Sequence, residues 1–212
     1  MARPVLYVLA GVNGAGKSSV GGHLLRRAGL DWFDPDAFAH DWVAQTGCDQ
    51  TTANGTAWQE GMRRLEAALA GARHHAFETT LGGNTMTAAI RDATRTHDVL
   101  MWFCGLSTPE LHIARVQARV AAGGHAIPEA MIRTRFVRSR ENLLALMPHL
   151  AQLRVFDNSP DAASDGTVPD PLLLLDMQAG RLLWPGPQDL DALWRTPDWA
   201  KPVLEAALQT QA

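Results

Sequence analysis

The sequence predicts an α/β fold in which a parallel sheet is covered by helices on both faces. Over the first 160 residues, apolar runs of strand length alternate with segments of helical periodicity, and this alternation is typical of parallel sheets. The first run, Val5–Ala10, is continuously apolar and ends at Gly11, as expected of a strand buried on both faces. With 212 residues, 46% of them hydrophobic, the chain has enough apolar mass for one core, and we expect one domain.

Helices and strands follow in regular order after this first strand. A helix is expected at Lys17–Arg27, where apolar residues recur at helical spacing. Further strands are expected at 31–33, 75–78, 99–104 and 153–157, and further helices at 37–43, 57–70, 86–95, 107–122 and 128–146. The helix ending near 122 has the clearest start, because Thr108 offers a hydroxyl cap and Pro109 suits the first helical position.

The last fifty residues differ from the rest of the chain. Seven of the 12 prolines lie between Pro160 and Pro202, and charges become sparse. Residues 172–177 and 182–184 predict a hairpin around the turn 178–180, and Trp194 and Trp199 predict an arm packed on the core. We therefore expect a core over 1–160 with a helical lid near 115–142, followed by a hairpin and arm over 161–212 on the same domain.

Charge and cysteine content exclude several classes of protein. The net charge of −3 argues against a surface made for nucleic acid or membrane, so any positive site must be local. The two cysteines, Cys48 and Cys104, have neither disulfide-framework nor zinc-site spacing. No apolar stretch reaches the roughly 18 residues of a membrane span. We expect a cytoplasmic protein.

A glycine-rich loop joins the first strand to the first helix. Residues 11–18, GVNGAGKS, match G-x4-G-K-[ST] in the required strand-to-helix context. Lys17 is one of only two lysines in a chain with 17 arginines, which disfavours the alternative of a chance glycine-rich turn. The loop predicts a P-loop, or Walker A motif, in which Lys17 binds ATP phosphates and the Ser18 hydroxyl binds Mg²⁺. The expected cofactor-binding residues are Gly11, Asn13, Gly14, Ala15, Gly16, Lys17, Ser18 and Ser19.

Two acidic residues follow the expected second strand. Asp34 can cap the next helix, while Asp36 lies in its first turn, at the sheet edge where ligands of open α/β folds bind. Asp36 is therefore the candidate base, able to orient and deprotonate a substrate hydroxyl facing the γ-phosphate. The alternative is that both acids only complement the helix dipole. We favour this alternative for Asp34 and the catalytic role for Asp36.

Glu78, Thr79 and Thr80 end the expected third strand at the same edge. Glu78 and Thr80 are candidate substrate contacts or partners of Mg²⁺-bound water, although the threonines could instead cap the following helix. The adjacent His74 and His75 lack a third metal ligand nearby in the sequence and are expected to lie in solvent or in the core.

Six arginines and one acid lie between 115 and 140. Arg115 and Arg119 are four residues apart, a like-charge spacing that is unfavourable on a helix unless an anion binds there. The segment 123–128 predicts a lid hinge, and lid arginines stabilise transition-state charge in phosphoryl transfer. A solvated arginine face is the alternative.

These motifs together resemble the zeta-toxin-like P-loop kinases over about residues 4–160. The matching segments are 11–18, 34–38, 78–81, 115–120, 123–128 and 135–143. The resemblance implies an ATP-dependent small-molecule kinase, and the toxins of this family phosphorylate UDP-N-acetylglucosamine. By motif position, Lys17 and Ser18 would bind phosphate and magnesium, Asp36 would be the base, Glu78 and Thr80 would contact substrate, and Arg119 would clamp phosphate.

The chain departs from the family pattern at two positions. Thr79 stands where the family usually has a glycine between the acidic residue and the hydroxyl-bearing residue, and His125 replaces a common lid arginine. These differences leave the identity of the substrate open. His125, Arg135 or Arg138 is expected to supply the missing phosphate contact, beside Arg115.

We expect an ATP- and Mg²⁺-dependent kinase acting on a hydroxyl of a nucleotide-sugar or related metabolite. An antitoxin-like inhibitor is a candidate partner; nucleic acid and membrane are not. A nucleic-acid end kinase and a non-catalytic nucleotide-binding module are the alternatives. The basic segment has no aromatic residue beyond Phe136 on which bases could stack, which argues against the end kinase. A module that only binds nucleotide needs no base, so Asp36 argues against the second alternative.

Overall fold

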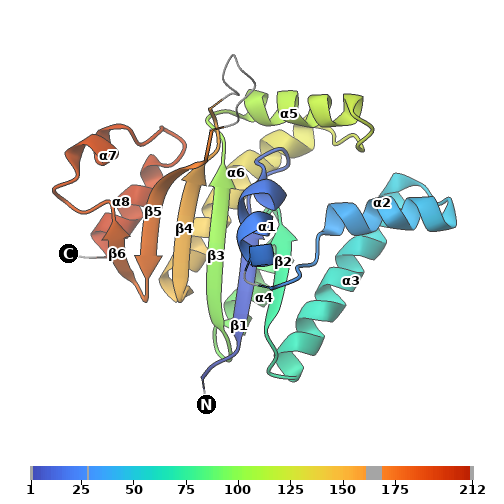
Figure 1. The fold of residues 1–212 in the computed structure, drawn as a ribbon, viewed down its shortest axis with the longest axis horizontal. Coiled ribbons are helices and arrows are strands. Elements are labelled where there is room, and N and C mark those ends of the chain that lie inside the picture. The colour runs from blue at the N-terminus through green and yellow to red at the C-terminus, as the bar shows by residue number, and fades with distance from the viewer. Residues whose placement is uncertain (1, 28, 161–168, 211–212) are drawn as a thin grey trace.

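The computed structural model describes residues 2–27, 29–160 and 169–210. A six-stranded sheet in the order β2-β1-β3-β4-β5-β6 forms the centre of the molecule (Figure 1). Strands β1 (Val5–Ala10), β2 (His75–Thr79), β3 (Asp98–Gly105) and β4 (Gln152–Asp157) are parallel. Strands β5 (Leu172–Gln178) and β6 (Arg181–Trp184) add an antiparallel hairpin. The predicted α/β class and hairpin are confirmed.

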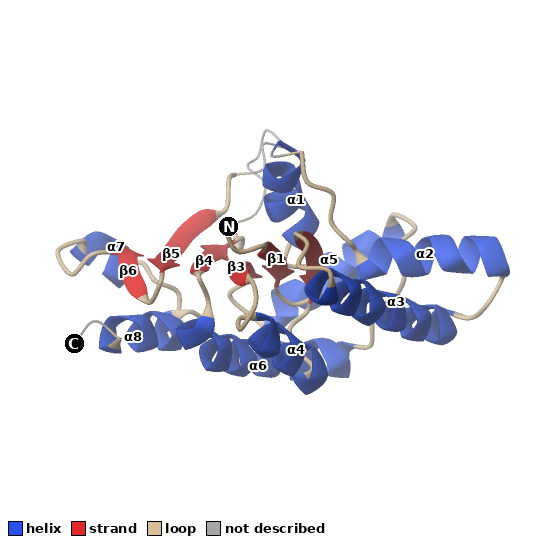
Figure 2. Cartoon of the chain, turned by 90° about the horizontal axis from the view of Figure 1, so that it is seen from below, coloured by secondary structure: helices blue, strands red, loops and turns tan. Residues whose placement is uncertain are grey.

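Helices cover both faces of this sheet, with α1 on one face and α4, α6 and α8 on the other (Figure 2). The helices are α1 (Lys17–Arg27), α2 (Pro35–Thr46), α3 (Gln50–Ala70), α4 (Asn84–Ala93), α5 (Pro109–Ala121), α6 (Glu129–Leu146), the 3₁₀ turn η1 (Met147–His149), α7 (Leu190–Trp194) and α8 (Lys201–Gln209). None of the described helices is long and apolar enough to cross a membrane.

The alternation of side chains along the strands divides the core between the two faces. Leu6 and Val8 of β1 belong to the large cluster that includes Met101 and Phe103 of β3 and buried side chains of α4, α6 and α8. Leu9 points the other way and packs with Leu25 of α1. Continuously apolar strands are therefore needed in the centre of the sheet, as the sequence indicated.

The expected strand at 31–33 is reduced to a single bridge. Phe33 pairs with Phe77 of β2, donating its N–H to Ala76 and accepting from the N–H of Glu78, both at 2.9 Å. The strand cannot continue because the Asp34 carboxylate already caps α2, accepting from the N–H of Asp36 at 2.9 Å. Phe33 therefore attaches the α2–α3 pair to the edge of the sheet.

Helix α3 begins seven residues earlier than expected. Asp49 caps it by accepting from the N–H of Thr52 at 3.0 Å. The early turns lack large apolar side chains, but Ala53 and Ala57 are buried against Ala39 of α2. On the α3 side, small residues therefore make this contact, while α2 adds the partly buried Phe38 and Trp42. Large apolar side chains alone do not indicate the first turns of α3.

The C-terminal arm packs through only one of its two tryptophans. Trp199 is 4% exposed, whereas Trp194 is 85% exposed, so the expectation that both pack on the core was wrong for Trp194. The Trp199 ring lies against Gly105 at the end of β3, where a Cβ atom added to the glycine would be 2.3 Å from the ring. Residues 161–168, the start of the expected C-terminal unit, lie outside the described residues.

We predict that Gly105→Ala lowers the free energy of unfolding by about 1 to 3 kcal/mol, because the added methyl group displaces a buried indole. Urea denaturation measures the change. Gly55→Ala is the matched control: Gly55 lies inside α3 with open space around it, so alanine there should stabilise the protein by about 1 kcal/mol. Equal stability of Gly105→Ala and wild type would contradict the close packing of Trp199.

Candidate functional site

The predicted P-loop connects β1 to α1 at the carboxyl edge of the sheet. The N–H of Gly11 donates to the carbonyl of Thr79 at 3.2 Å, which ties the loop to the end of β2. Gly14 and Gly16 have φ values of 81° and 83°, a conformation that favours glycine. The two glycines thus let the backbone curve tightly before the helix begins at Lys17.

The curved loop presents free backbone donors. Between described residues, the N–H groups of Gly14, Gly16, Lys17 and Ser18 donate no hydrogen bond. Lys17 is half-buried and Ser18 is exposed. Free amides at a helix N-terminus beside a lysine suit phosphate oxygens, so these residues fit the triphosphate of ATP.

The donor set for magnesium is smaller. No three His, Cys, Asp or Glu side chains of the described residues group together as a metal site. Mg²⁺ needs few protein ligands when it is bound with nucleotide phosphates, and the Ser18 hydroxyl suits that role.

Asn13 connects the P-loop to the helices above it. Its side-chain oxygen accepts from Nη1 of Arg135 at 2.7 Å, and its carbonyl oxygen lies 2.9 Å from Nδ1 of His112. Burial lowers the pKa of His112 to about 4, against the opposing effect of this hydrogen bond. His112 is therefore neutral at pH 7 and donates from Nδ1. Asn13 is buried and acts by holding the loop.

Asp36 lies beside two residues of the predicted lid. Its Oδ2 is 3.2 Å from Nη1 of Arg119, and its Oδ1 is 3.9 Å from Nε2 of His125. Nε and Nη2 of Arg119 are buried and have no hydrogen-bond partner among the described residues. Unpaired buried donors are costly, so this guanidinium is suited to receive an anion in addition to Asp36.

Glu78 is a buried acid at the end of β2. It is 5% exposed, and Nε1 of Trp32 donates to its Oε1 at 2.9 Å. Desolvation raises the pKa of Glu78, with a smaller contribution from the charge of Asp34 and with opposing effects of Lys17, Ser18 and Trp32. Glu78 is thus close enough to Lys17 and Ser18 to respond to bound phosphate or metal.

The two threonines after Glu78 have different surroundings. Thr79 accepts from the N–H of Leu81 at 3.0 Å and supports a local turn. Thr80 is half-buried, and both its Oγ1 and the stem of Arg135 lie near Gly82. Of the two threonines, Thr80 therefore lies near Arg135 of α6.

The arginines of α5 and α6 divide into inward and outward groups. Arg115 donates from Nη2 to the carbonyls of Ser159 and Pro160, both at 3.3 Å. Arg119 and Arg135 face Asp36 and Asn13. Arg138 is exposed and makes no hydrogen bond or ion pair with a described residue, so the structure does not bring it to the site.

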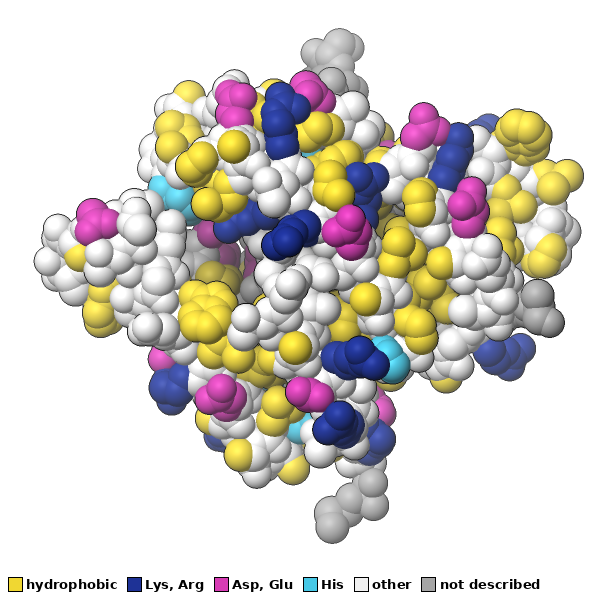
Figure 3. Space-filling model, turned by 180° about the vertical axis from the view of Figure 1, so that it is seen from behind, with side chains coloured by type: hydrophobic (Ala, Val, Ile, Leu, Met, Phe, Trp, Pro, Cys, Tyr) yellow, Lys and Arg dark blue, Asp and Glu magenta, His cyan; other side chains and the backbone are white. Residues whose placement is uncertain are grey.

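Other predicted basic residues have structural partners. Arg133 pairs with Glu110 at 2.6 Å on the surface, and the Arg140 guanidinium lies 4.3 Å from the Phe136 ring centre. His74 accepts from the N–H of Val5 at 3.0 Å. In the space-filling view, basic side chains border a hollow between the projecting α2–α3 pair and the rest of the molecule (Figure 3).

Comparisons with known proteins bear on the fold of the chain. No protein-family model matches the chain. A shikimate kinase of Shewanella frigidimarina is 31% identical over 112 residues, which are 51% of this chain and 63% of the kinase. The chain thus spans less than two thirds of that relative. The structure of AvrRxo1-ORF1:-ORF2 with ATP aligns with a TM-score of 0.62 at 16% identity, over 97% of this chain and 64% of that one.

A second solved structure comes from the PezAT chromosomal toxin–antitoxin system of Streptococcus pneumoniae. Its TM-score is 0.58 at 13% identity, over all of this chain and 85% of that one. The chain has a P-loop kinase fold. Its resemblance to zeta-toxin-like kinases therefore holds at the level of the fold.

Two residues around the site, His112 and Trp32, were missed by sequence reasoning, and a third, Asn158, was recognised only as part of the loop after the last core strand. His112, Trp32 and Asn158 hold Asn13, Glu78 and the carbonyl of Ala15, respectively. Each contact joins segments far apart in the chain. The only available signal was the position of Asn158 directly after a core strand.

We predict that Glu78→Gln raises the free energy of unfolding at pH 7. The pKa of Glu78 is higher in the folded protein than in the unfolded chain, so the wild type loses stability as the pH rises above about 4.5. Glutamine removes this loss, and the advantage of the variant should vanish as the pH falls toward 4. Urea titrations at several pH values measure the difference. Glu66→Gln, at an exposed position of α3, is the control. A pH-independent difference for Glu78→Gln would contradict the prediction.

Proposed function

We propose that this protein is an ATP-dependent kinase that transfers the γ-phosphate to a hydroxyl of a small metabolite such as a nucleotide-sugar. One observation carries the proposal: Asp36 is held by Arg119 at the same sheet edge as the P-loop. A protein that only binds nucleotide needs the loop and Lys17. A carboxylate beside a partly unpaired guanidinium can take the proton of an acceptor hydroxyl and stabilise the transferring phosphoryl group.

Each residue of the site has its own role in the proposed reaction. The amides of the loop and Lys17 bind the triphosphate, and Ser18 binds the accompanying Mg²⁺, which neutralises phosphate charge. Asp36 orients the acceptor hydroxyl and takes its proton. Arg119 now shares its charge with Asp36, and its unpaired Nε and Nη2 can bind the transferring phosphoryl group at the same time.

We assign acceptor recognition to the surrounding buried and half-buried side chains. Glu78 and Thr80 come from the end of β2 and the loop after it, His125 from the lid hinge, and Arg135 from α6. Of the two candidates to replace the family's lid arginine, Arg135 is supported by its contact with Asn13, and Arg138 is not. We propose that the segment 115–142 closes as a lid over the acceptor.

A protein inhibitor is also part of the proposal. The neighbour from Streptococcus pneumoniae belongs to a toxin–antitoxin system, which supports an antitoxin-like partner for this chain. Both cysteines are free thiols, as expected for action in the cytoplasm.

Measurement of ATP consumption tests the proposal, using UDP-sugars, free sugars, shikimate and 5′-hydroxyl oligonucleotides as acceptors and mass spectrometry of the products. We expect a phosphorylated small molecule with wild type and none with Lys17→Ala. Phosphorylated oligonucleotide alone would establish the end-kinase alternative. ATP binding without any turnover would establish the non-catalytic one.

We predict that Asp36→Asn keeps ATP binding but slows transfer by several orders of magnitude, because an amide cannot accept the hydroxyl proton. ATP affinity from calorimetry and kcat from the product assay separate the two effects. An equal loss of ATP affinity would place Asp36 at the nucleotide instead. Asp41→Asn, on the exposed face of α2, is the matched control.

We predict that Arg119→Ala lowers kcat by roughly 10³-fold with little change in ATP affinity, on the scale of an arginine finger. Arg119→Lys should also be impaired, since lysine keeps the charge but cannot bind Asp36 and phosphate together. Arg133→Ala, which breaks only a surface ion pair, should behave as wild type. A loss confined to ATP affinity would contradict the transition-state role.

A further inference from the structure

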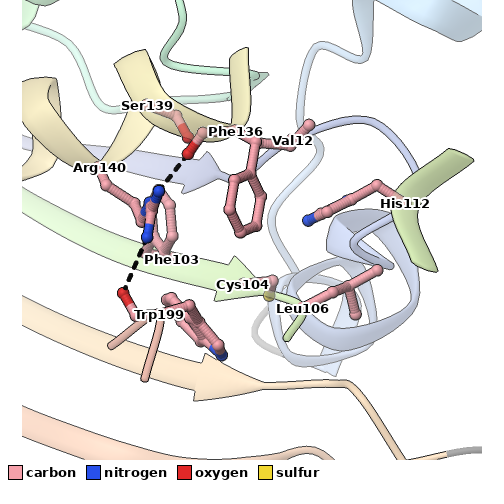
Figure 4. A pocket seen from close by; sticks show the side chains of 10 residues that line it. Val12, Phe103, Cys104, Leu106, His112, Phe136, Ser139, Arg140 and Trp199 are labelled. Carbon is pink, nitrogen blue, oxygen red and sulfur yellow. Dashed lines mark hydrogen bonds between the residues drawn. The ribbon is translucent and has the colours of Figure 1, made fainter. Parts of the chain in front are cut away.

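The C-terminal arm is connected to the end of β4 by a buried hydrogen bond. Nε1 of Trp199 donates to Oδ1 of Asp157 at 3.2 Å, and both residues are buried. The Trp199 ring lies beside Phe103 and Cys104 in the core (Figure 4). A cavity of about 10 Å³ there also borders Val12 of the P-loop. The indole is thus fixed by packing on its faces and by Asp157 at its edge.

Asp157 begins a loop that is hydrogen-bonded on several sides. Its Oδ1 also accepts from the N–H and the hydroxyl of Ser159. The Ser159 hydroxyl oxygen accepts from the N–H of Ser107, after β3, at 2.8 Å. Arg115 of α5 binds the carbonyls of Ser159 and Pro160. A single carboxylate therefore organises residues 157–160 between the arm and the lid helix.

The same loop contacts the P-loop directly. Nδ2 of Asn158 donates to the carbonyl of Ala15 at 3.0 Å. A Cβ on Gly16 would be 2.4 Å from this Nδ2, so the amide group occupies the space above the glycine. Asn158 thereby restrains Ala15 and Gly16, the two residues that precede Lys17. The N–H of Gly16 is one of the free amides of the loop.

We propose that Trp199, Asp157 and Asn158 are positioning residues for nucleotide binding: the C-terminal arm sets the conformation of the P-loop through the loop 157–160. This assignment rests on the proposed function for the identity of the ligand, ATP. None of the three residues needs to touch the nucleotide. Each acts by raising the fraction of molecules whose P-loop is ready to bind, and that fraction scales the apparent affinity.

Two variants test the connection between the C-terminal arm and the P-loop, and each removes a hydrogen bond at one of its ends. Trp199→Phe keeps an aromatic ring against Gly105 but removes the N–H donor to Asp157. Asn158→Ala removes the contact with Ala15. Trp184→Phe is the control, because it removes an indole donor to the carbonyl of Leu173 in the exposed hairpin, away from the P-loop.

Hydrogen exchange of the ligand-free proteins gives the first readout. We expect exchange of the peptide covering 11–20 to be about tenfold faster in Trp199→Phe and Asn158→Ala, with strand β3 and the control variant unchanged. Unchanged exchange at 11–20 in either variant would overturn the proposal, whatever the protein binds. Equal acceleration throughout the chain would also overturn it, since that result shows a general loss of stability.

Calorimetric titration with Mg·ATP gives the second readout. We expect each single variant to raise the Kd about tenfold, and the double variant to raise it no further than about tenfold, because both changes act through one loop. A hundredfold loss in the double variant would show independent effects and overturn the shared path. Failure of the wild type to bind ATP would refute the proposed function, while the exchange experiment would still decide the connection.

Discussion

Parallel pairing of β1 with β2 and β3 is the constraint on which the site depends. The register places Ala10 opposite Thr79 on one side and Phe103 on the other. Because parallel strands end at the same edge, the P-loop, the segment after Glu78 and the start of α5 meet there without any long excursion of the chain. A slip of one residue would exchange the two faces of a strand and turn Glu78 away from Lys17.

Two charged residues at this edge of the sheet lower the stability of the fold. Glu78 is buried with a raised pKa, and Arg119 holds two unpaired buried donors. A structure selected only for stability would replace such groups with apolar ones. Their presence beside a loop of free amides, and the pairing of Arg119 with Asp36, are explained together if an anion completes the arrangement.

The elements that could be predicted from the sequence are those marked by a short, local pattern of residues. The strand at Val5–Ala10, the helix beginning after Thr108 and the hairpin after 171 all follow from short patterns, and the structure has each of them. Packing between distant segments was not predictable in this way. The contact of Asp36 with Arg119 spans 83 residues, and the burial of Trp199, unlike Trp194, depends on a space above Gly105. Periodicity contains no information on either.

The α2–α3 pair projects from the molecule and is joined to the sheet edge by the backbone bridge at Phe33 (Figure 1). Helix α2 has 12 residues and is therefore about 18 Å long, with Asp36 in its first turn. Leu65 of α3 is 1% exposed and lies in the same core cluster as Phe33 and Phe77, so the pair is anchored at this end by side chains as well as by the bridge. The anchored end is the one that carries Asp36, and the far end of α2 lies away from the sheet (Figure 1). The position of Asp36 is therefore set by the rigid core, whatever the sequence at the far end of the pair.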